Sequence, residues 1–171
     1  LETDKRREIT RPEWLAIAKS CRKKYPVVLP ENKDQNPVNT YHLVDRLSTL
    51  APEGAQILTD TSSIFHVSAQ AWKIKKNQRY ITTGGISTMG YWVAAVGMCI
   101  ANGRKPTIVL VGDGSLEMNI HGFATVKGEN LPVKIFVLNN NGYLLIRHTQ
   151  KNFFEGRMIG ESPASGVTLP D

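Results

Sequence analysis

The chain has 171 residues, with 21 basic and 15 acidic side chains and a formal net charge of +6. This length suffices for one α/β domain with a sizeable core plus an extension. No apolar stretch reaches membrane-spanning length, and the charged start Leu1–Arg7 lacks the apolar core of a signal peptide. We therefore expect a cytoplasmic protein that does not bind membranes.

The basic residues are dispersed, and no aromatic residues interleave with them at a spacing suited to base stacking. Solvated helix faces explain the positive charge better than nucleic acid binding, which is the weaker alternative. Cys21 and Cys99 are far apart and form no Cys-x-x-Cys spacing, so we expect two reduced thiols.

The N-terminal quarter differs in pattern from the rest of the chain. Residues 11–25 are predicted to form a helix, because Pro12 suits a first turn and apolar residues from Trp14 to Cys21 recur at helical spacing. Residues 26–37 are polar and contain three prolines, which indicates a linker or an extended arm. We interpret residues 1–38 as the tail of a preceding domain with its connector, and residues 39–171 as a separate domain.

From residue 39 onward, short apolar strands alternate with helices of about ten to fifteen residues, which is typical of a parallel sheet covered on both faces. Asn39 or Thr40 can cap the first of these helices, which ends before Pro52. The expected strands span residues 55–59, 79–83, 106–111 and 132–138, and the further helices span residues 63–72, 88–102 and 115–127. The predicted fold class is therefore an α/β three-layer sandwich with a mostly parallel sheet.

A turn rich in small polar residues follows each predicted strand. These turns are Asp60–Ser63, Gly84–Ser87, Asp113–Ser115 and Asn139–Gly142. Because the carboxyl ends of parallel strands meet at one edge of a sheet, where ligands of such folds bind, we expect the four turns to lie together.

The turns after the third and fourth strands contain the residue types of a magnesium site. Asp113 is a hard anionic oxygen ligand, Asn140 supplies a neutral amide oxygen, and Gly142 can offer its main-chain carbonyl. Ser115 begins a helix whose free N–H groups can bind an anion, and Gly114 lets the backbone approach a ligand closely. Each dipeptide alone would be an ordinary turn, but together they favour a divalent cation that bridges to a diphosphate.

Gly112-Asp113-Gly114, followed after twenty-four residues by Asn139-Asn140, resembles the cofactor motif of thiamine diphosphate enzymes. The stretches Thr83–Tyr91, Gly112–Ile120 and Leu131–Asn140 resemble the acetolactate synthase branch of that family. The resemblance implies that residues 39–171 are the domain that binds the diphosphate side of the cofactor, with Mg²⁺ as the metal.

The resemblance also implies roles for other residues. Met89 matches the apolar side chain that fills the bend of the cofactor, and the carbonyl of Ser87 matches the group that accepts from its pyrimidine amine. Ser62 and Ser63 fall where the family places groups near the diphosphate, although they replace the Gly-Gln-His-Gln of acetolactate synthases. Leu144, which follows the Asn-Asn turn, is expected to contact the cofactor as well.

In the family, a glutamate on a separate pyrimidine-binding domain activates the cofactor, and no residue here matches it. We therefore assign no catalytic residue to this chain. We expect further domains upstream, a C-terminus short of the family's closing helix and strand, and a homodimer or homotetramer. Any FAD would be held by the missing middle domain.

The resemblance implies a thiamine diphosphate-dependent carboligase or decarboxylase acting on 2-keto acids. Thr149 replaces the tryptophan that selects the second keto acid in acetolactate synthases, which leaves room for an aldehyde or a keto-sugar, as in polysaccharide biosynthesis. His148 is a candidate substrate contact, whereas His42, His66 and His121 are expected to be structural or at the surface. The alternatives are a simple 2-keto acid decarboxylase and a cofactor-binding module without catalysis.

Overall fold

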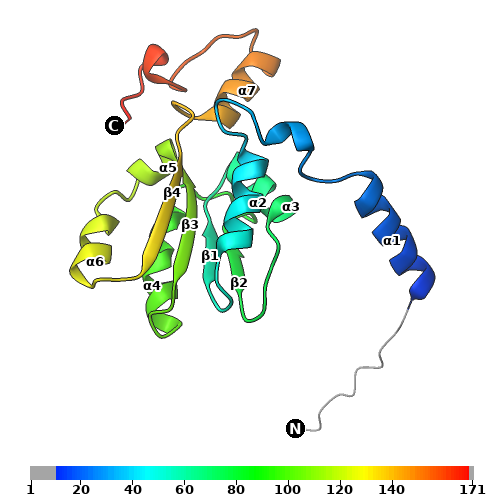
Figure 1. Ribbon diagram of the computed structural model, residues 1–171. Coiled ribbons are helices and arrows are strands. Elements are labelled where there is room, and N and C mark those ends of the chain that lie inside the picture. Colours follow the sequence, from blue (N-terminus) through cyan, green and yellow to red (C-terminus); the bar gives the residue numbers. More distant parts are fainter. Residues whose placement is uncertain (1–10, 170–171) are drawn as a thin grey trace.

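Four short strands form one sheet in residues 11–169, which are the residues that the computed structural model describes (Figure 1). The strands are β1 (Gln56–Thr59), β2 (Arg79–Thr82), β3 (Thr107–Gly112) and β4 (Val133–Leu138). Their order is β2-β1-β3-β4, and every neighbouring pair is parallel. Helices cover both faces, which confirms the predicted α/β class and its three layers.

Alternating side chains of the central strands β1 and β3 fill two separate cores. Ile57 and Leu110 face helices α2 (Thr40–Leu50) and α3 (Ser63–Ala71). Leu58 and Val109 face the opposite layer, where η2 (Tyr91–Val93) and α4 (Ala94–Ala101) lie. Burial on both faces explains why consecutive residues of these strands are apolar, as in Ile57-Leu58 and Ile108–Val111, rather than every second one.

The beginning of α2 agrees with the sequence prediction, and the structure chooses between the two candidate caps. The Asn39 side-chain oxygen accepts hydrogen bonds from the main-chain N–H groups of Tyr41 and His42, at 2.9 and 3.3 Å. Asn39 is therefore the N-cap, since it satisfies two of the free N–H groups of the first turn.

The predicted helix over residues 115–127 is wrong in its bounds and in its continuity. The structure has a short α5 (Asp113–Glu117), a turn, and then α6 (Gly122–Gly128). The indole N–H of Trp92 and the main-chain N–H of Asn119 both donate to the Leu116 carbonyl, at 3.1 and 3.3 Å. Because these groups occupy the carbonyl that a continuing helix would use, the helix stops there.

The predicted helix over residues 88–102 begins later than expected. Gly90 adopts a left-handed conformation with φ of +76°, and the 3₁₀ turn η2 precedes α4. The main-chain N–H of Trp92 donates to the side chain of Asp60 at 2.8 Å rather than to a helical carbonyl. Residues 88–90 are therefore part of the turn after β2.

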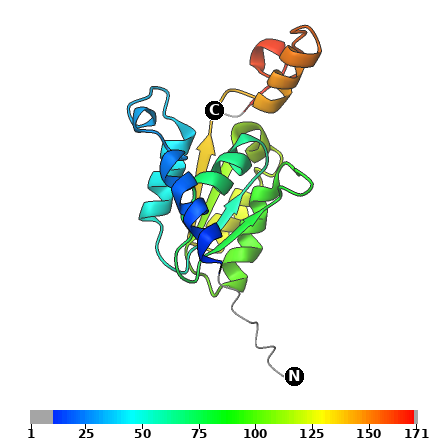
Figure 2. The same ribbon diagram turned by 90° about the vertical axis from the view of Figure 1, so that its right-hand side faces the viewer.

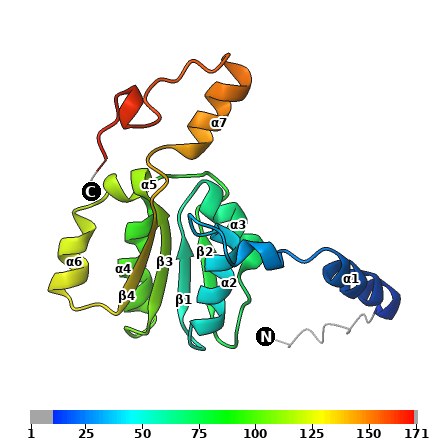
Figure 3. The same ribbon diagram turned by 45° about the horizontal axis from the view of Figure 1, so that its top comes forward.

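The two ends of the described chain lie outside the sheet. At the N-terminal end, α1 (Pro12–Lys24) and η1 (Pro30–Asn32) precede α2, and α1 stands away from the strands in Figures 1 and 3. No residue of α1 is buried within the described chain. The division at residue 38 stays a prediction.

At the other end, α7 (Leu144–Phe153) and η3 (Pro163–Ser165) lie beyond the carboxyl end of β4, as Figure 2 shows. The sequence pattern predicted no secondary structure for these residues. Among residues 11–169, no helix combines the length and the apolar character that crossing a membrane requires.

Candidate functional site

The four turns that follow the strands surround one cavity of about 230 Å³ at the carboxyl edge of the sheet. Strand order reverses between β1 and β3, which is where ligands bind in open α/β sheets. The described residues that line the cavity are Thr61, Ser62, Ser63, Ile64, His66, Ser87, Met89, Gly112, Asp113, Gly114, Ser115, Leu138, Asn140, Gly142, Tyr143, Leu144, Leu145 and Ile146.

All ten residues predicted to contact a cofactor line this cavity, although they come from four turns spread over about half of the chain. They are Ser62, Ser63, Ser87, Met89, Asp113, Gly114, Ser115, Asn140, Gly142 and Leu144. The structure therefore places the predicted residues together, while their contacts with a cofactor stay a prediction.

The carboxylate of Asp113 lies at the cavity wall and is oriented by two main-chain groups. Its Oδ1 accepts from the N–H of Gly114 and its Oδ2 accepts from the N–H of Gly142, both at 2.9 Å. The residue is only 5% exposed. Since each carboxylate oxygen has two acceptor positions, both oxygens can still bind a cation.

The side-chain oxygen of Asn140 also lies at the cavity and is free to bind a ligand. Its Oδ1 is buried and finds no hydrogen-bond partner among residues 11–169. A buried amide oxygen without a partner costs about 1–3 kcal/mol, so such an atom calls for a ligand. Asn140 lines the cavity together with Asp113, and a cation bound between them would satisfy this oxygen.

The charges around the cavity favour a cation rather than a direct ion pair with a phosphate. None of the described lining residues is Lys or Arg, and Asp113 is their one carboxylate. A diphosphate would therefore meet a negative side chain without a positive one to balance it. A divalent cation held by Asp113 would reverse this local charge. No group of three His, Cys, Asp or Glu within residues 11–169 could hold a metal, so such a site would rely on amide and carbonyl oxygens.

The hydroxyl of Ser115 connects three of the turns around the cavity. It donates to Asp60 Oδ1 at 2.7 Å and accepts from the main-chain N–H of Gly90 at 2.7 Å. These two hydrogen bonds join the turns after β1, β2 and β3, while the contact of Ser115 with a cofactor stays a prediction. The helix that it was expected to begin starts at Asp113 and has five residues.

Asp60 is a buried residue behind the cavity that was not among the predicted site residues. Its carboxylate is fully buried and accepts from Thr61 N at 2.7 Å, Trp92 N at 2.8 Å and the Ser115 hydroxyl. It therefore holds together the turns after β1, β2 and β3. The only available signal was its place at the start of the Asp60–Ser63 turn.

Tyr143 was also missed, since an aromatic residue after the Asn-Asn turn has no obvious sequence meaning. A Cβ atom on Gly114 would lie 2.3 Å from its ring, so the two residues are in close contact. Burial raises the pKa of the Tyr143 phenol, and the carboxylates of Glu117 and Asp113 raise this pKa further. The phenol is therefore neutral across the physiological pH range.

Other backbone features mark the cavity as a strained region. Ser62 has φ of +73° and ψ of −154°, a conformation that is otherwise essentially restricted to glycine. Ser87 also has a positive φ, at +56°. Residues in such unfavourable backbone conformations persist only where the surrounding structure fixes them, and they are concentrated at ligand-binding and active sites.

The residues predicted to act on the substrate side, His148 and Thr149, are exposed and do not line the cavity. The preceding residues of α7, Leu144, Leu145 and Ile146, do line it. The Thr149 hydroxyl donates to the Leu145 carbonyl within α7 at 2.9 Å. His66, which we expected to be structural or at the surface, is exposed and also lines the cavity.

A family model described as "Thiamine pyrophosphate enzyme, C-terminal TPP binding domain" matches residues 60–169. The match begins at Asp60 and includes all four turns that surround the cavity. The chain belongs to the thiamine pyrophosphate (thiamine diphosphate) enzyme family. The resemblance stated from its motifs is confirmed.

Within this family, the chain is similar to acetolactate synthases. It is 32% identical over 146 residues to acetolactate synthase isozyme 1 large subunit of Escherichia coli (strain K12), covering 85% of this chain and 26% of the relative. Identity to the acetolactate synthase large subunit of Lactococcus lactis subsp. lactis (strain IL1403) is 31% over 147 residues, or 85% and 25% of the two chains. The acetolactate synthase catalytic subunit, mitochondrial, of Saccharomyces cerevisiae is 30% identical over 151 residues, or 86% and 22%. The chain thus spans about a quarter of the length of these relatives.

Proposed function

We propose that this chain supplies the diphosphate- and cation-binding side of the active site in a thiamine diphosphate-dependent carboligase that acts on 2-keto acids. One observation carries the proposal: the buried Oδ1 of Asn140 has no partner in residues 11–169 and shares a cavity with the carboxylate of Asp113. The names of the relatives, all acetolactate synthases, support the substrate class and the reaction type.

The residues present suit Mg²⁺ as the cation. Asp113, the Asn140 amide oxygen and the Gly142 carbonyl are all oxygen donors, which Mg²⁺ prefers. Three such donors leave about half of a six-ligand shell for phosphate oxygens and water. The N–H groups of Gly114 and Gly142 hold the carboxylate in place, and such support strengthens metal binding.

The remaining lining residues would bind and orient the cofactor. Ser62 and Ser63 offer hydroxyl groups near the start of α3, and Met89 and Leu144 offer apolar surface on the other sides. When bound, thiamine diphosphate supplies the stabilised carbanion that acts on the keto acid. This chain contributes binding, orientation and exclusion of water.

The cavity is smaller than the pockets of about 300–1,000 Å³ that enclose a whole drug-sized ligand. It therefore suits one part of a cofactor, and the other part would be covered by a further domain or subunit. On this view the activating glutamate lies outside the chain, and the complete protein is a homodimer or homotetramer. Any FAD would be bound by a middle domain outside this chain. We also propose a cytoplasmic location for the protein.

Cofactor binding can be tested on the complete protein by titration with thiamine diphosphate and Mg²⁺ after both have been removed. Asn140→Ala should weaken Mg²⁺ binding by more than about tenfold, since even the loss of a group behind a metal ligand has that effect. Asn152→Ala is the matched control, because Asn152 is exposed on α7. Equal Mg²⁺ affinity in both variants would contradict the assignment.

Product analysis separates the reactions that the fold can support. A hydroxyketone formed from two carbonyl substrates indicates ligation, and comparison of pyruvate with aldehyde and keto-sugar acceptors identifies the acceptor. Release of an aldehyde alone indicates a simple decarboxylase. Cofactor binding without turnover of any 2-keto acid would instead favour a binding module.

A further inference from the structure

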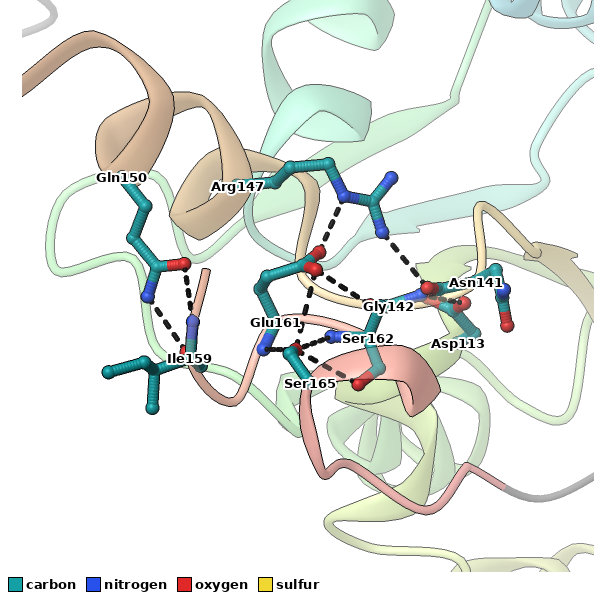
Figure 4. A network of polar contacts seen from close by, with 9 residues as sticks. All are labelled: Asp113, Asn141, Gly142, Arg147, Gln150, Ile159, Glu161, Ser162 and Ser165. Carbon is teal, nitrogen blue, oxygen red and sulfur yellow. Dashed lines mark hydrogen bonds and ion pairs between the residues drawn. The ribbon is translucent and has the colours of Figure 1, made fainter. Parts of the chain in front are cut away.

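The segment after α7 folds back onto the turn that contains Asn140 (Figure 4). The carbonyl of Glu161 accepts from the main-chain N–H of Tyr143 at 2.7 Å. Gly142 has φ of +133°, and a Cβ atom there would lie 2.0 Å from the same carbonyl. The backbone of Glu161 is therefore in direct contact with the end of the turn, which leaves no room for a side chain at Gly142.

The side chain of Glu161 is buried among polar groups that hold it in one orientation. Its carboxylate accepts from Arg147 Nε at 2.5 Å, from Ser162 Oγ at 2.6 Å and from Ser165 Oγ at 3.3 Å. The side chain is 6% exposed. In the other ion pairs of the described residues, every partner is at least 21% exposed, so the Glu161 carboxylate is the most shielded ion-pair partner in this part of the chain, while Arg147 is 31% exposed.

Arg147 extends this contact to the turn itself. While Nε donates to Glu161, Nη2 donates to the Asn141 carbonyl at 3.0 Å. The planar guanidinium can do both because its donors point in fixed and different directions. Figure 4 shows Arg147 between the Glu161 carboxylate and the Asn141 carbonyl.

The Asn141 carbonyl belongs to the same peptide group as the N–H of Gly142. Because that group is planar, fixing the carbonyl at one end also fixes the N–H at the other. The Gly142 N–H donates to Asp113 Oδ2 at 2.9 Å. A continuous path therefore runs from Glu161 through Arg147 and one peptide group to the carboxylate at the cavity.

We propose that Arg147 and Glu161 are positioning residues for the cation site. Neither lines the cavity, yet together they set the orientation of the peptide group that holds Asp113. The segment 156–165 is thus part of the cation-binding apparatus. This inference rests on the proposed function, in which Asp113 and Asn140 bind the cation.

Two measurements on the complete protein test it. The first is hydrogen exchange of the peptide covering residues 139–147 in protein freed of metal and cofactor, which reports on the turn without any ligand. The second is titration with Mn²⁺ followed by electron paramagnetic resonance, with Mn²⁺ in place of Mg²⁺. The variants are Arg147→Ala, Arg147→Lys, Glu161→Ala and Glu161→Gln.

Arg157→Ala is the matched control. Arg157 is exposed in the same segment and forms no ion pair or side-chain hydrogen bond with another residue in the described part of the chain. Like Arg147→Ala, the substitution Arg157→Ala removes one positive charge from this region, but it leaves the hydrogen bonds that connect Glu161 through Arg147 to Asp113 intact.

We expect Arg147→Ala and Glu161→Ala to speed exchange in residues 139–147 and to weaken Mn²⁺ binding about tenfold, the usual effect of losing a group that orients a metal ligand. Glu161→Gln should fall between Glu161→Ala and the wild type, because an amide oxygen can still accept from Arg147. Arg147→Lys should behave like Arg147→Ala, since an ammonium lacks the fixed fork that reaches both partners.

The outcomes separate this inference from the proposed function. If the wild type does not bind Mn²⁺, the proposed function fails and this inference fails with it. If the wild type binds Mn²⁺ and all Arg147 and Glu161 variants bind it equally well, only the positioning role is overturned. A nonspecific loss of stability would not be confined to the Arg147 and Glu161 variants. If Arg157→Ala changes exchange and Mn²⁺ binding as much as they do, the positioning role is therefore also overturned.

Discussion

The carboxylate of Asp113 and the main-chain N–H of Gly142 are joined by a hydrogen bond of 2.9 Å that links the ends of two neighbouring strands. Asp113 directly follows β3 and Gly142 lies in the turn after β4. The bond brings the acid close to the turn that contains Asn140, whose buried oxygen has no partner in residues 11–169. This relationship makes the cavity suited to a cation.

Asp113→Asn should destabilise the protein even without a ligand. Both carboxylate oxygens accept N–H groups, so an amide nitrogen at either place would face a donor. Leaving one buried donor unpaired costs about 1–3 kcal/mol. Urea unfolding of metal-free protein measures the loss, with Asp34→Asn as the control, because Asp34 is exposed and lies before α2. A variant as stable as the wild type would contradict the role of these bonds.

Asp60→Ala should have a larger effect on stability. The substitution removes three accepted hydrogen bonds at once and leaves Thr61 N, Trp92 N and the Ser115 hydroxyl without their partner. Since each unsatisfied buried donor costs about 1–3 kcal/mol, we expect a total loss above about 3 kcal/mol. Asp60→Asn should lose less, because one amide oxygen still accepts. The measurement is again denaturant unfolding, and a loss below about 1 kcal/mol for Asp60→Ala would refute the expectation.

Two glycine substitutions should have opposite effects. Gly142→Ala places a Cβ atom 2.0 Å from the Glu161 carbonyl at a φ of +133°, so it should destabilise the fold and speed proteolysis after α7. Gly97→Ala meets no atom within 4 Å and lies inside α4, where alanine is favoured by about 0.5–1 kcal/mol. Thermal unfolding of both variants tests the contrast. Similar melting temperatures would contradict it.

Acid should loosen the C-terminal segment through Glu161. Hydrogen bonds from Ser162 and then from Arg147 lower the pKa of this carboxyl from its ordinary value of 4.5. Because the pKa is lower in the folded state, its contribution to stability is fully present above pH 4.5 and is lost as the pH falls through the lowered pKa.

This acid dependence can be measured as hydrogen exchange of residues 156–166 between pH 6 and pH 3, after correction for intrinsic rates. Glu161→Gln cannot titrate, so its exchange protection should stay flat over the range in which the wild type loses protection. Parallel pH dependences in the two proteins would assign the effect to another group.

The sequence by itself determined the parts of this protein that depend on short-range patterns. Apolar runs alternating with amphipathic stretches predicted the parallel α/β fold, and Asn39 was one of two predicted caps. Because parallel strands bring their carboxyl ends to one edge, the pattern also placed Asp113 and Asn140 in a common cavity. Backbone geometry alone imposes these relationships, so they needed no knowledge of the tertiary structure.

Only the tertiary structure decided which polar groups pair across the turns. The strand order places β3 between β1 and β4, and this order makes Asp60 the partner of Ser115 and Asp113 the partner of Gly142. The same long-range packing breaks the helix after Glu117 and brings Glu161 onto the turn. Hydrogen bonds need partners within about 3 Å, and residues so far apart in sequence meet at that distance only once the sheet has assembled.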